Sequence, residues 1–131
     1  MPATFADCAR WQRMLETHAD EFTELAPGAA VGLMRAADYR AGAGPIIRLQ
    51  RDAAGGLRAH VERSSRTPDL PVLLVLDDRG IAPLQSLGPA CAARLVRTRL
   101  LHPYILQGPA ELAASGAAAL VERLGLAFPR H

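Results

Sequence analysis

The fold of this 131-residue chain is decided by the stretch VLLVL at residues 72–76. Five consecutive apolar residues between two polar segments have the length of a strand rather than of a helix. A strand without alternation is buried on both faces, so Val72–Leu76 is predicted as a central strand of a sheet. The residues after it, 77–80, are typical of a turn, and 81–84 predict a short return strand that Pro83 confines to an edge.

Upstream of this strand, residues 45–63 predict a β-hairpin. In its first strand Ile47 and Leu49 alternate with less apolar positions, and the second strand alternates in the same way after a glycine-containing turn at 52–56. The second strand's apolar positions are Leu57, Ala59 and Val61. The hairpin therefore has one apolar face and one charged face, which faces solvent or a partner.

The pattern of the N-terminal part predicts a helix over residues 4–25. Residues 4–25 carry apolar side chains at three- and four-residue steps, and Thr4 with Asp7 resembles a capping box. Residues 29–41 fit two structures: a helix that stops at Gly42, which is slightly favoured, or a strand at its beginning. This choice between helix and strand stays open at the level of the sequence.

The C-terminal part predicts helices over 89–101 and 109–124, separated by a short strand at 104–106. Together these segments predict an α+β fold in one domain, 1–131. Its mixed, mostly antiparallel sheet has four to five strands, and three to four helices pack mainly on one face.

Composition excludes several classes of protein. Hydrophobic residues make up 50% of the chain and charged residues 21%, which is ordinary for a globular protein. All fifteen basic residues are arginine, so mechanisms that need a lysine are excluded. There is no signal peptide pattern and no membrane-spanning run, and Cys8 and Cys91 form no metal or redox motif. We expect a cytoplasmic protein without metal or cofactor; the roles of the two cysteines stay open.

Two sets of residues are candidates for a site. Asp77 and Asp78 directly follow the central strand. Carboxylates at the end of a strand can bind a metal ion or act as a base, so these two residues are a candidate acidic site. The same residues also suit a plain turn. The charged hairpin face predicts an anion-binding or partner-binding site, since arginine forks suit phosphate and carboxylate. Its members are Arg48, Arg58, His60 and Arg63.

The segment 85–90, Gln-Ser-Leu-Gly-Pro-Ala, resembles the Q/R-x-x-G-x-G/A loop of GNAT acyltransferases. In that family, backbone amides at the start of a helix hold the pyrophosphate of acyl-CoA, so the resemblance implies a phosphate loop at Gln85, Gly88 and Ala90. Residues 117–126 look like a late helix of the same family. The chain departs from the pattern at Val121, where the family has a tyrosine, and at Pro89, which has no amide hydrogen.

Three functions are compatible with these observations. The first is a small non-enzymatic binding or regulatory module that acts through a protein partner or as a homodimer. The alternatives are a GNAT-like acyl-CoA-dependent acyltransferase and a binder of anions or nucleic acid through the arginine-rich segment. That segment holds Arg48, Arg51, Arg58, Arg63 and Arg66. It has no aromatic residue for base stacking, which disfavours nucleic acid. Whether the chain is an enzyme stays open.

Overall fold

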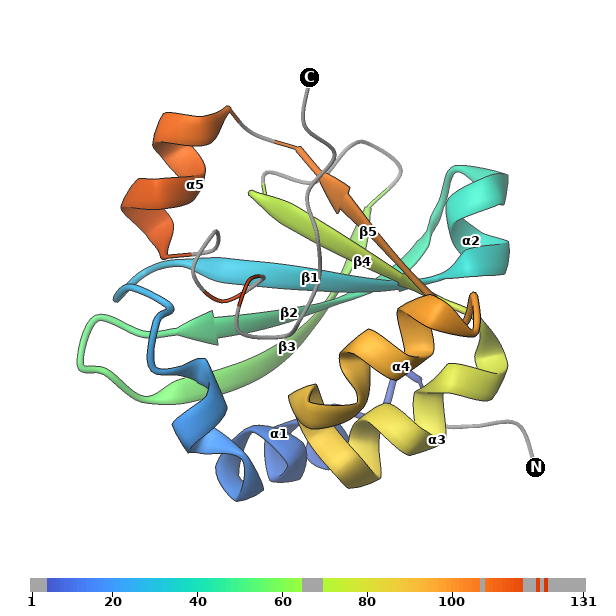
Figure 1. The fold of residues 1–131 in the computed structure, drawn as a ribbon, viewed down its shortest axis with the longest axis horizontal. Coiled ribbons are helices and arrows are strands. Elements are labelled where there is room, and N and C mark those ends of the chain that lie inside the picture. Colours follow the sequence, from blue (N-terminus) through green and yellow to red (C-terminus); the bar gives the residue numbers. More distant parts are fainter. Residues whose placement is uncertain (1–4, 65–69, 107, 117–119, 121, 123–131) are drawn as a thin grey trace.

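A computed structural model describes residues 5–64, 70–106, 108–116, 120 and 122. Its centre is a five-stranded mixed sheet in the order β3-β2-β1-β4-β5 (Figure 1). β1 and β4 run parallel, and every other neighbouring pair is antiparallel. The strands are β1 Ala30–Arg35, β2 Gly44–Arg51, β3 Leu57–Ser64, β4 Val72–Leu76 and β5 Leu101–Ile105. The predicted α+β class and mostly antiparallel sheet are confirmed.

Most of the described helical segments lie together against one face of this sheet (Figure 1). They are α1 Cys8–Thr17, the 3₁₀ turn η1 Ala19–Phe22, α3 Asp78–Leu87, the 3₁₀ turn η2 Gly88–Cys91 and α4 Ala92–Arg97. Two further helices are α2 Ala36–Ala41, which follows β1, and α5 Pro109–Ser115. No helix among the described residues is long and apolar enough to cross a membrane.

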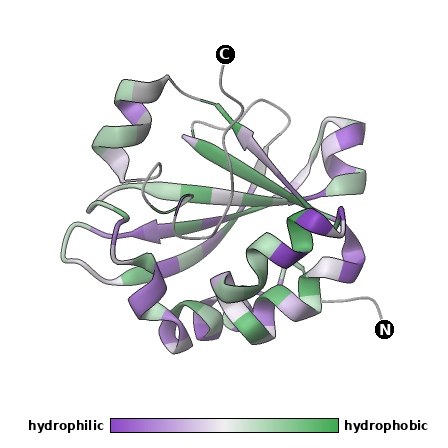
Figure 2. Ribbon diagram, in the orientation of Figure 1, coloured by the Kyte–Doolittle hydropathy of each residue, from purple (hydrophilic) through white to green (hydrophobic). Residues whose placement is uncertain are grey.

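The strand β4 is buried on both faces, as its sequence predicts. Val72, Leu74 and Leu76 pack with the helices, whereas Leu73 and Val75 belong to a smaller core on the opposite face. All five side chains are at most 6% exposed. Figure 2 shows the same contrast: β4 is coloured hydrophobic along its length, while hydrophilic colours lie on parts of the helices and on β2.

The slight preference for a helix over 29–41 was wrong for its first half. Residues 30–35 form β1, because pairing with β4 lets Val31 and Leu33 face the helices while Ala30 and Met34 face the other way. The second half is helical, and α2 ends at Gly42 as predicted. Gly42 has a φ of 83°, a left-handed conformation that favours glycine.

The turn and edge strand predicted for 77–84 were also wrong. Asp77 is the N-cap of α3, and its carboxylate accepts a hydrogen bond from the amide of Arg79 at 2.9 Å. Ile81 and Leu84, three residues apart, share the buried face of this helix. Pro83 lies inside the helix despite its missing amide hydrogen, so burial outweighed the local cost of the proline.

The three remaining predicted helices differ from the structure in their extent. The first helix begins later, with Asp7 rather than Thr4 in the described cap, and changes to a 3₁₀ turn after Thr17. The helix predicted over 89–101 ends at Arg97, so His102 and Pro103 lie inside the edge strand β5, where a proline is tolerated. Of the helix predicted over 109–124, α5 covers the first part; residues 117–119, 121, 123 and 124 lie outside the described residues.

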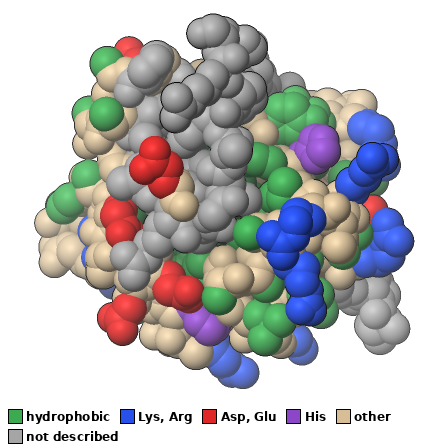
Figure 3. Space-filling model, viewed as in Figure 1, with side chains coloured by type: hydrophobic (Ala, Val, Ile, Leu, Met, Phe, Trp, Pro, Cys, Tyr) green, Lys and Arg blue, Asp and Glu red, His purple; other side chains and the backbone are tan. Residues whose placement is uncertain are grey.

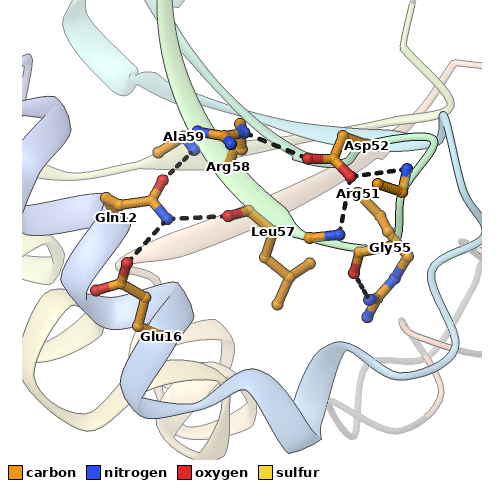
Figure 4. A network of polar contacts seen from close by, with 10 residues as sticks. Gln12, Glu16, Arg51, Asp52, Gly55, Leu57, Arg58 and Ala59 are labelled. Carbon is orange, nitrogen blue, oxygen red and sulfur yellow. Dashed lines mark hydrogen bonds and ion pairs between the residues drawn. The ribbon is translucent and has the colours of Figure 1, made fainter.

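The outer edge of the sheet is closed by a glutamine from α1 (Figure 4). The Gln12 side-chain amide donates to the carbonyl of Leu57 at 2.9 Å and accepts from the amide of Ala59 at 2.8 Å. These are two β3 backbone groups on the side away from β2. An unpaired edge is a template for other chains, and Gln12 satisfies part of it while fixing α1 against the sheet.

We predict that Gln12→Ala lowers the free energy of unfolding by about 1–3 kcal/mol, because it leaves a β3 donor and acceptor without their partner. Urea denaturation measures this change. The matched control is Glu16→Ala, which removes only the exposed 3.3 Å contact to the Gln12 amide and should change stability by less than about 0.5 kcal/mol. Equal effects of the two substitutions would contradict the role given to Gln12.

Candidate functional site

A small apolar cavity lies between the sheet and its helical layer. Its volume is about 20 Å³. The strands contribute side chains from alternate positions, all pointing to the helix-covered face: Val31, Leu33, Leu49, Val72, Leu74 and Leu101. The helical segments and the C-terminal part contribute Met14, Phe22, Leu84, Pro89, Ala92 and Leu120. Every described side chain around it is apolar.

The cover of this cavity is made of short helical pieces. The chain from α3 through η2 to α4 is interrupted at Gly88, whose φ of 67° is left-handed. A Cβ at Gly88 would come within 2.5 Å of the His18 ring, so glycine is required there both for its conformation and for this close approach. Pro83 removes one helical hydrogen bond from α3. The cover therefore has fewer internal hydrogen bonds than one continuous helix.

Burial also defines the chemistry of Cys91, which lies in this cover. Its sulfur donates to the carbonyl of Gly88 at 3.3 Å. Burial is the main cause that raises the pKa of the Cys91 thiol, so the thiol is protonated at neutral pH. Cys91 is thus buried in its neutral, protonated form. Cys8 is a free, half-buried cysteine.

The two predicted acidic residues are both engaged in ion pairs. Asp78 receives two hydrogen bonds from the Arg35 guanidinium, at 2.8 and 2.9 Å. Asp77, besides capping α3, accepts from the side chain of Arg79 at 3.0 Å. These hydrogen bonds are the largest cause that lowers the pKa of each carboxyl. Among the described residues no group of His, Cys, Asp and Glu could hold a metal ion.

The hairpin arginines whose side chains the structure describes are compensated by nearby acids or carbonyls. Arg48 pairs with Glu62 at 3.3 Å. Arg58 pairs with Asp52 at 3.3 Å, as Figure 4 shows. His60 is exposed and lies opposite Arg48 in the β2–β3 register. The side chain of Arg63 and the whole of Arg66 lie outside the described residues. The anion-binding or partner-binding role of Arg48, Arg58, His60 and Arg63 stays a prediction.

Arg51 turns inward to the protein backbone. Its guanidinium donates to the carbonyls of Leu25 at 2.8 Å, Phe22 at 2.8 Å and Gly55 at 2.6 Å. It therefore ties the segment after η1 to the β2–β3 turn, and Leu25 and Phe22 are buried beside it. No local pattern in the sequence indicates this role, because two of the carbonyls come from a segment 26 to 29 residues away.

The predicted phosphate loop is not a loop before a helix. Gln85 lies in the last turn of α3, and Gly88 closes that helix by donating its amide to the Leu84 carbonyl. Ala90 belongs to the 3₁₀ turn η2. Because the Gly88 amide is already used and Pro89 has none, these residues do not form the amide cradle that the GNAT resemblance implies. Most of the second resembling segment, 117–126, lies outside the described residues.

Comparison with known proteins gave matches among solved structures only. No family model and no curated protein matches the chain. Three of the solved structures that are similar to it are the following. A UbiJ-SCP2 ubiquinone synthesis protein has a TM-score of 0.43 and 15% identity, covering 95% of this chain and 96% of its own. The apo form of sterol carrier protein 2 from Yarrowia lipolytica has a TM-score of 0.40 and 18% identity, with coverage of 85% and 88%.

The third is the solution structure of a conserved hypothetical protein from Thermus thermophilus, which is named as a possible sterol carrier protein. Its TM-score is 0.42 at 17% identity, covering 99% of this chain and 92% of its own.

These findings contradict the function expected from the sequence. As the function of the chain, a module acting through a protein partner or self-association was wrong, and so were the two alternatives, a GNAT-like acyltransferase and a binder of anions or nucleic acid through the arginine-rich hairpin.

We predict a pH-dependent contribution from the Arg35–Asp78 pair. A carboxyl whose pKa is lowered by folding stabilises the protein above its unfolded pKa of about 4, and this contribution is lost as the pH falls through the lower folded pKa. Asp78→Asn should therefore destabilise the protein at pH 7 by less than about 1 kcal/mol, because the pair is exposed. The difference from the unmodified protein should close on acidification below about pH 4.

Urea denaturation at a series of pH values measures this difference. The control is the same substitution in an Arg35→Gln background, where the Asp78→Asn effect should shrink to the part that comes from its place in the first turn of α3. An Asp78→Asn effect that stays constant between pH 7 and pH 3, or that is as large without Arg35 as with it, would show that the ion pair is not its cause.

Proposed function

We propose that this chain binds an apolar, lipid-like small molecule between the sheet and its helical layer. The observation that carries the proposal is the cavity of about 20 Å³, around which every described side chain is apolar. An apolar cavity has no hydrogen-bonding groups for water, so it stays dry and is filled favourably by apolar groups. The names of the similar solved structures agree with this function, but the proposal rests on the cavity.

The cavity has to expand before it can accept such a ligand. A volume of about 20 Å³ holds little more than one water molecule, whereas a lipid tail has many methylene groups. The sheet side is fixed by ladder hydrogen bonds, so expansion has to come from the helical cover. The break at Gly88, the proline in α3 and the flexible side chain of Met14 are the features that allow these segments to shift outward.

Burial of apolar surface provides the driving force for binding. Each methylene group transferred from water to this space contributes about 0.8 kcal/mol, offset by the cost of moving the cover. No charged side chain is needed for such binding, which agrees with the ion pairs that Arg48, Arg58 and Asp78 already make on the surface. A cytoplasmic location and pairing of two copies stay predictions.

We predict that the neutral fluorophore N-phenyl-1-naphthylamine binds the chain and that Val31→Phe weakens this binding at least tenfold. Val31 lines the cavity and is 2% exposed, so a larger side chain occupies the ligand's space. Val31→Ile, which adds one methylene group, should act in the same direction with less risk to folding. Fluorescence titration measures the affinity, and displacement by dodecan-1-ol extends the result to a lipid-like ligand.

The matched control is Val61→Phe, the same substitution on an edge strand where the side chain is 36% exposed. It should leave the affinity for the fluorophore unchanged. The proposed function is contradicted if the unmodified chain does not bind the neutral fluorophore, or if the substitutions at Val31 and Val61 have the same effect on affinity.

A further inference from the structure

A second hollow lies on the opposite face of the sheet from the apolar cavity. It is a groove of about 320 Å³ between α2 and β5, beside the end of β4. Val75 forms part of its floor, and in the β4–β5 register it lies opposite His102. Since Val75 belongs to the smaller core on this face, the sheet separates the groove from the apolar cavity.

One part of the groove is a pair of stacked aromatic rings. Tyr39 from α2 and Tyr104 from β5 have ring centroids 4.8 Å apart and ring planes inclined by 25°. Tyr39 is 39% exposed, so this stack offers a flat apolar surface to a ligand in the groove. Aromatic groups of a ligand favour such surfaces, through offset or edge contacts with the rings.

The charged side chains of the lining are two arginines and one aspartate. Arg40 and Arg99 line the groove, are exposed, and make no ion pair within 4.0 Å with any residue that the structure describes. The single acid among the lining residues is Asp77, whose carboxylate accepts a hydrogen bond from the Arg79 side chain and also attracts Arg40, without a direct ion pair to it. Figure 3 shows arginine side chains gathered on the side of the molecule that carries α2 and α4. The groove thus has two available cations beside a flat apolar surface.

The backbone at Arg99 is an independent observation. Arg99 has a φ of 65°, and it is the one non-glycine residue with positive φ in the described part of the chain. It directly follows the C-cap of α4, a position where helices commonly have glycine. A side chain in this conformation is strained, and such strain is found where a side chain serves a function.

We propose that this groove binds a small molecule that joins a flat ring to an oxyanion. The ring lies against Tyr39 and Tyr104, and the oxyanion is held by Arg40 and Arg99, whose guanidinium groups match both carboxylate and phosphate. This site does not depend on the proposed function, since it lies on the other face of the sheet and recognises charge as well as an apolar surface.

The first test uses probes that separate the ring from the charge. Isothermal titration calorimetry is carried out with 2-naphthoate, 2-naphthyl phosphate, neutral 2-naphthalenemethanol and inorganic phosphate. The two probes with both features should bind at least tenfold more tightly than the two with only one, and the better of them identifies the oxyanion. The proposal is overturned if the neutral alcohol or inorganic phosphate binds as tightly as the combined probes.

The second test uses variants at Arg99 and Arg40. Arg99→Gly should weaken binding of the better probe at least fivefold and raise the melting temperature of the free protein, because glycine relieves the left-handed strain. Arg40→Gln should weaken binding to a similar extent. The control is Arg97→Gln, an exposed α4 arginine outside the groove, which should leave the affinity unchanged. Unchanged affinity in Arg99→Gly and Arg40→Gln, or an equal loss in Arg97→Gln, overturns the proposal.

Two further outcomes separate binding in the groove from binding elsewhere. If Val31→Phe abolishes 2-naphthoate binding while Arg40→Gln does not, the probe enters the apolar cavity, and the groove proposal fails while the proposed function stands. If no soluble probe binds but phosphatidylglycerol vesicles bind in a manner that depends on Arg40 and Arg99, the groove contacts a membrane surface and the proposal is overturned. Unchanged 2-naphthoate binding in Val31→Phe supports the groove.

Discussion

Burial of both faces of the parallel β1–β4 pair is the constraint on which the rest of this structure depends. Neither strand alternates apolar with polar residues, so neither face of the pair can be exposed to solvent. The helical layer α1–α3–α4 covers one face, and a smaller core that includes Leu70 and Ile46 covers the other. The charged hairpin face lies at the β3 edge, away from this pair. The positions of cavity, groove and ion pairs all follow from this division.

The apolar cavity follows from the way the first face is covered. Side chains from the strands reach toward helical segments that are short and interrupted, so the two surfaces do not fill all the space between them. Surrounding contacts hold the cover in place. The Arg51 guanidinium fixes the segment after η1, and the end of α5 meets the same segment where the Ala26 amide donates to the Ser115 carbonyl at 2.9 Å. These hydrogen bonds fix the cover around η1, whereas the helical hydrogen bonds are interrupted around Gly88.

The sequence predicted elements whose signal is local. The β2–β3 hairpin alternates clearly and β4 is a short apolar run, and both are confirmed. Residues 30–35 and 81–84 were misassigned because their structure is decided by distant partners. The first segment is a strand because β4 lies beside it, and the second is a helix because Asp77 caps it and the core accepts Ile81 and Leu84.

The candidate site could not be predicted in the same way. The cavity is lined by a few residues from each of many separate elements. In the sequence, none of these apolar residues differs from an ordinary core residue. The sequence instead predicted sites at Asp77, Asp78 and the hairpin arginines. The structure shows these residues in a helix cap and in ion pairs. The groove was missed because Tyr39 and Tyr104 lie far apart in the sequence and meet only through the fold.

The central claim is that an apolar ligand enters the space between the sheet and the helices. Its most direct test is methyl NMR spectroscopy of the labelled chain with dodecan-1-ol, recording nuclear Overhauser effects between ligand and protein. The account predicts contacts to the methyl groups of Met14, Leu33 and Leu74, which point into the cavity from α1, β1 and β4. Contacts confined to exposed side chains such as Leu87, which is 52% exposed, would contradict it.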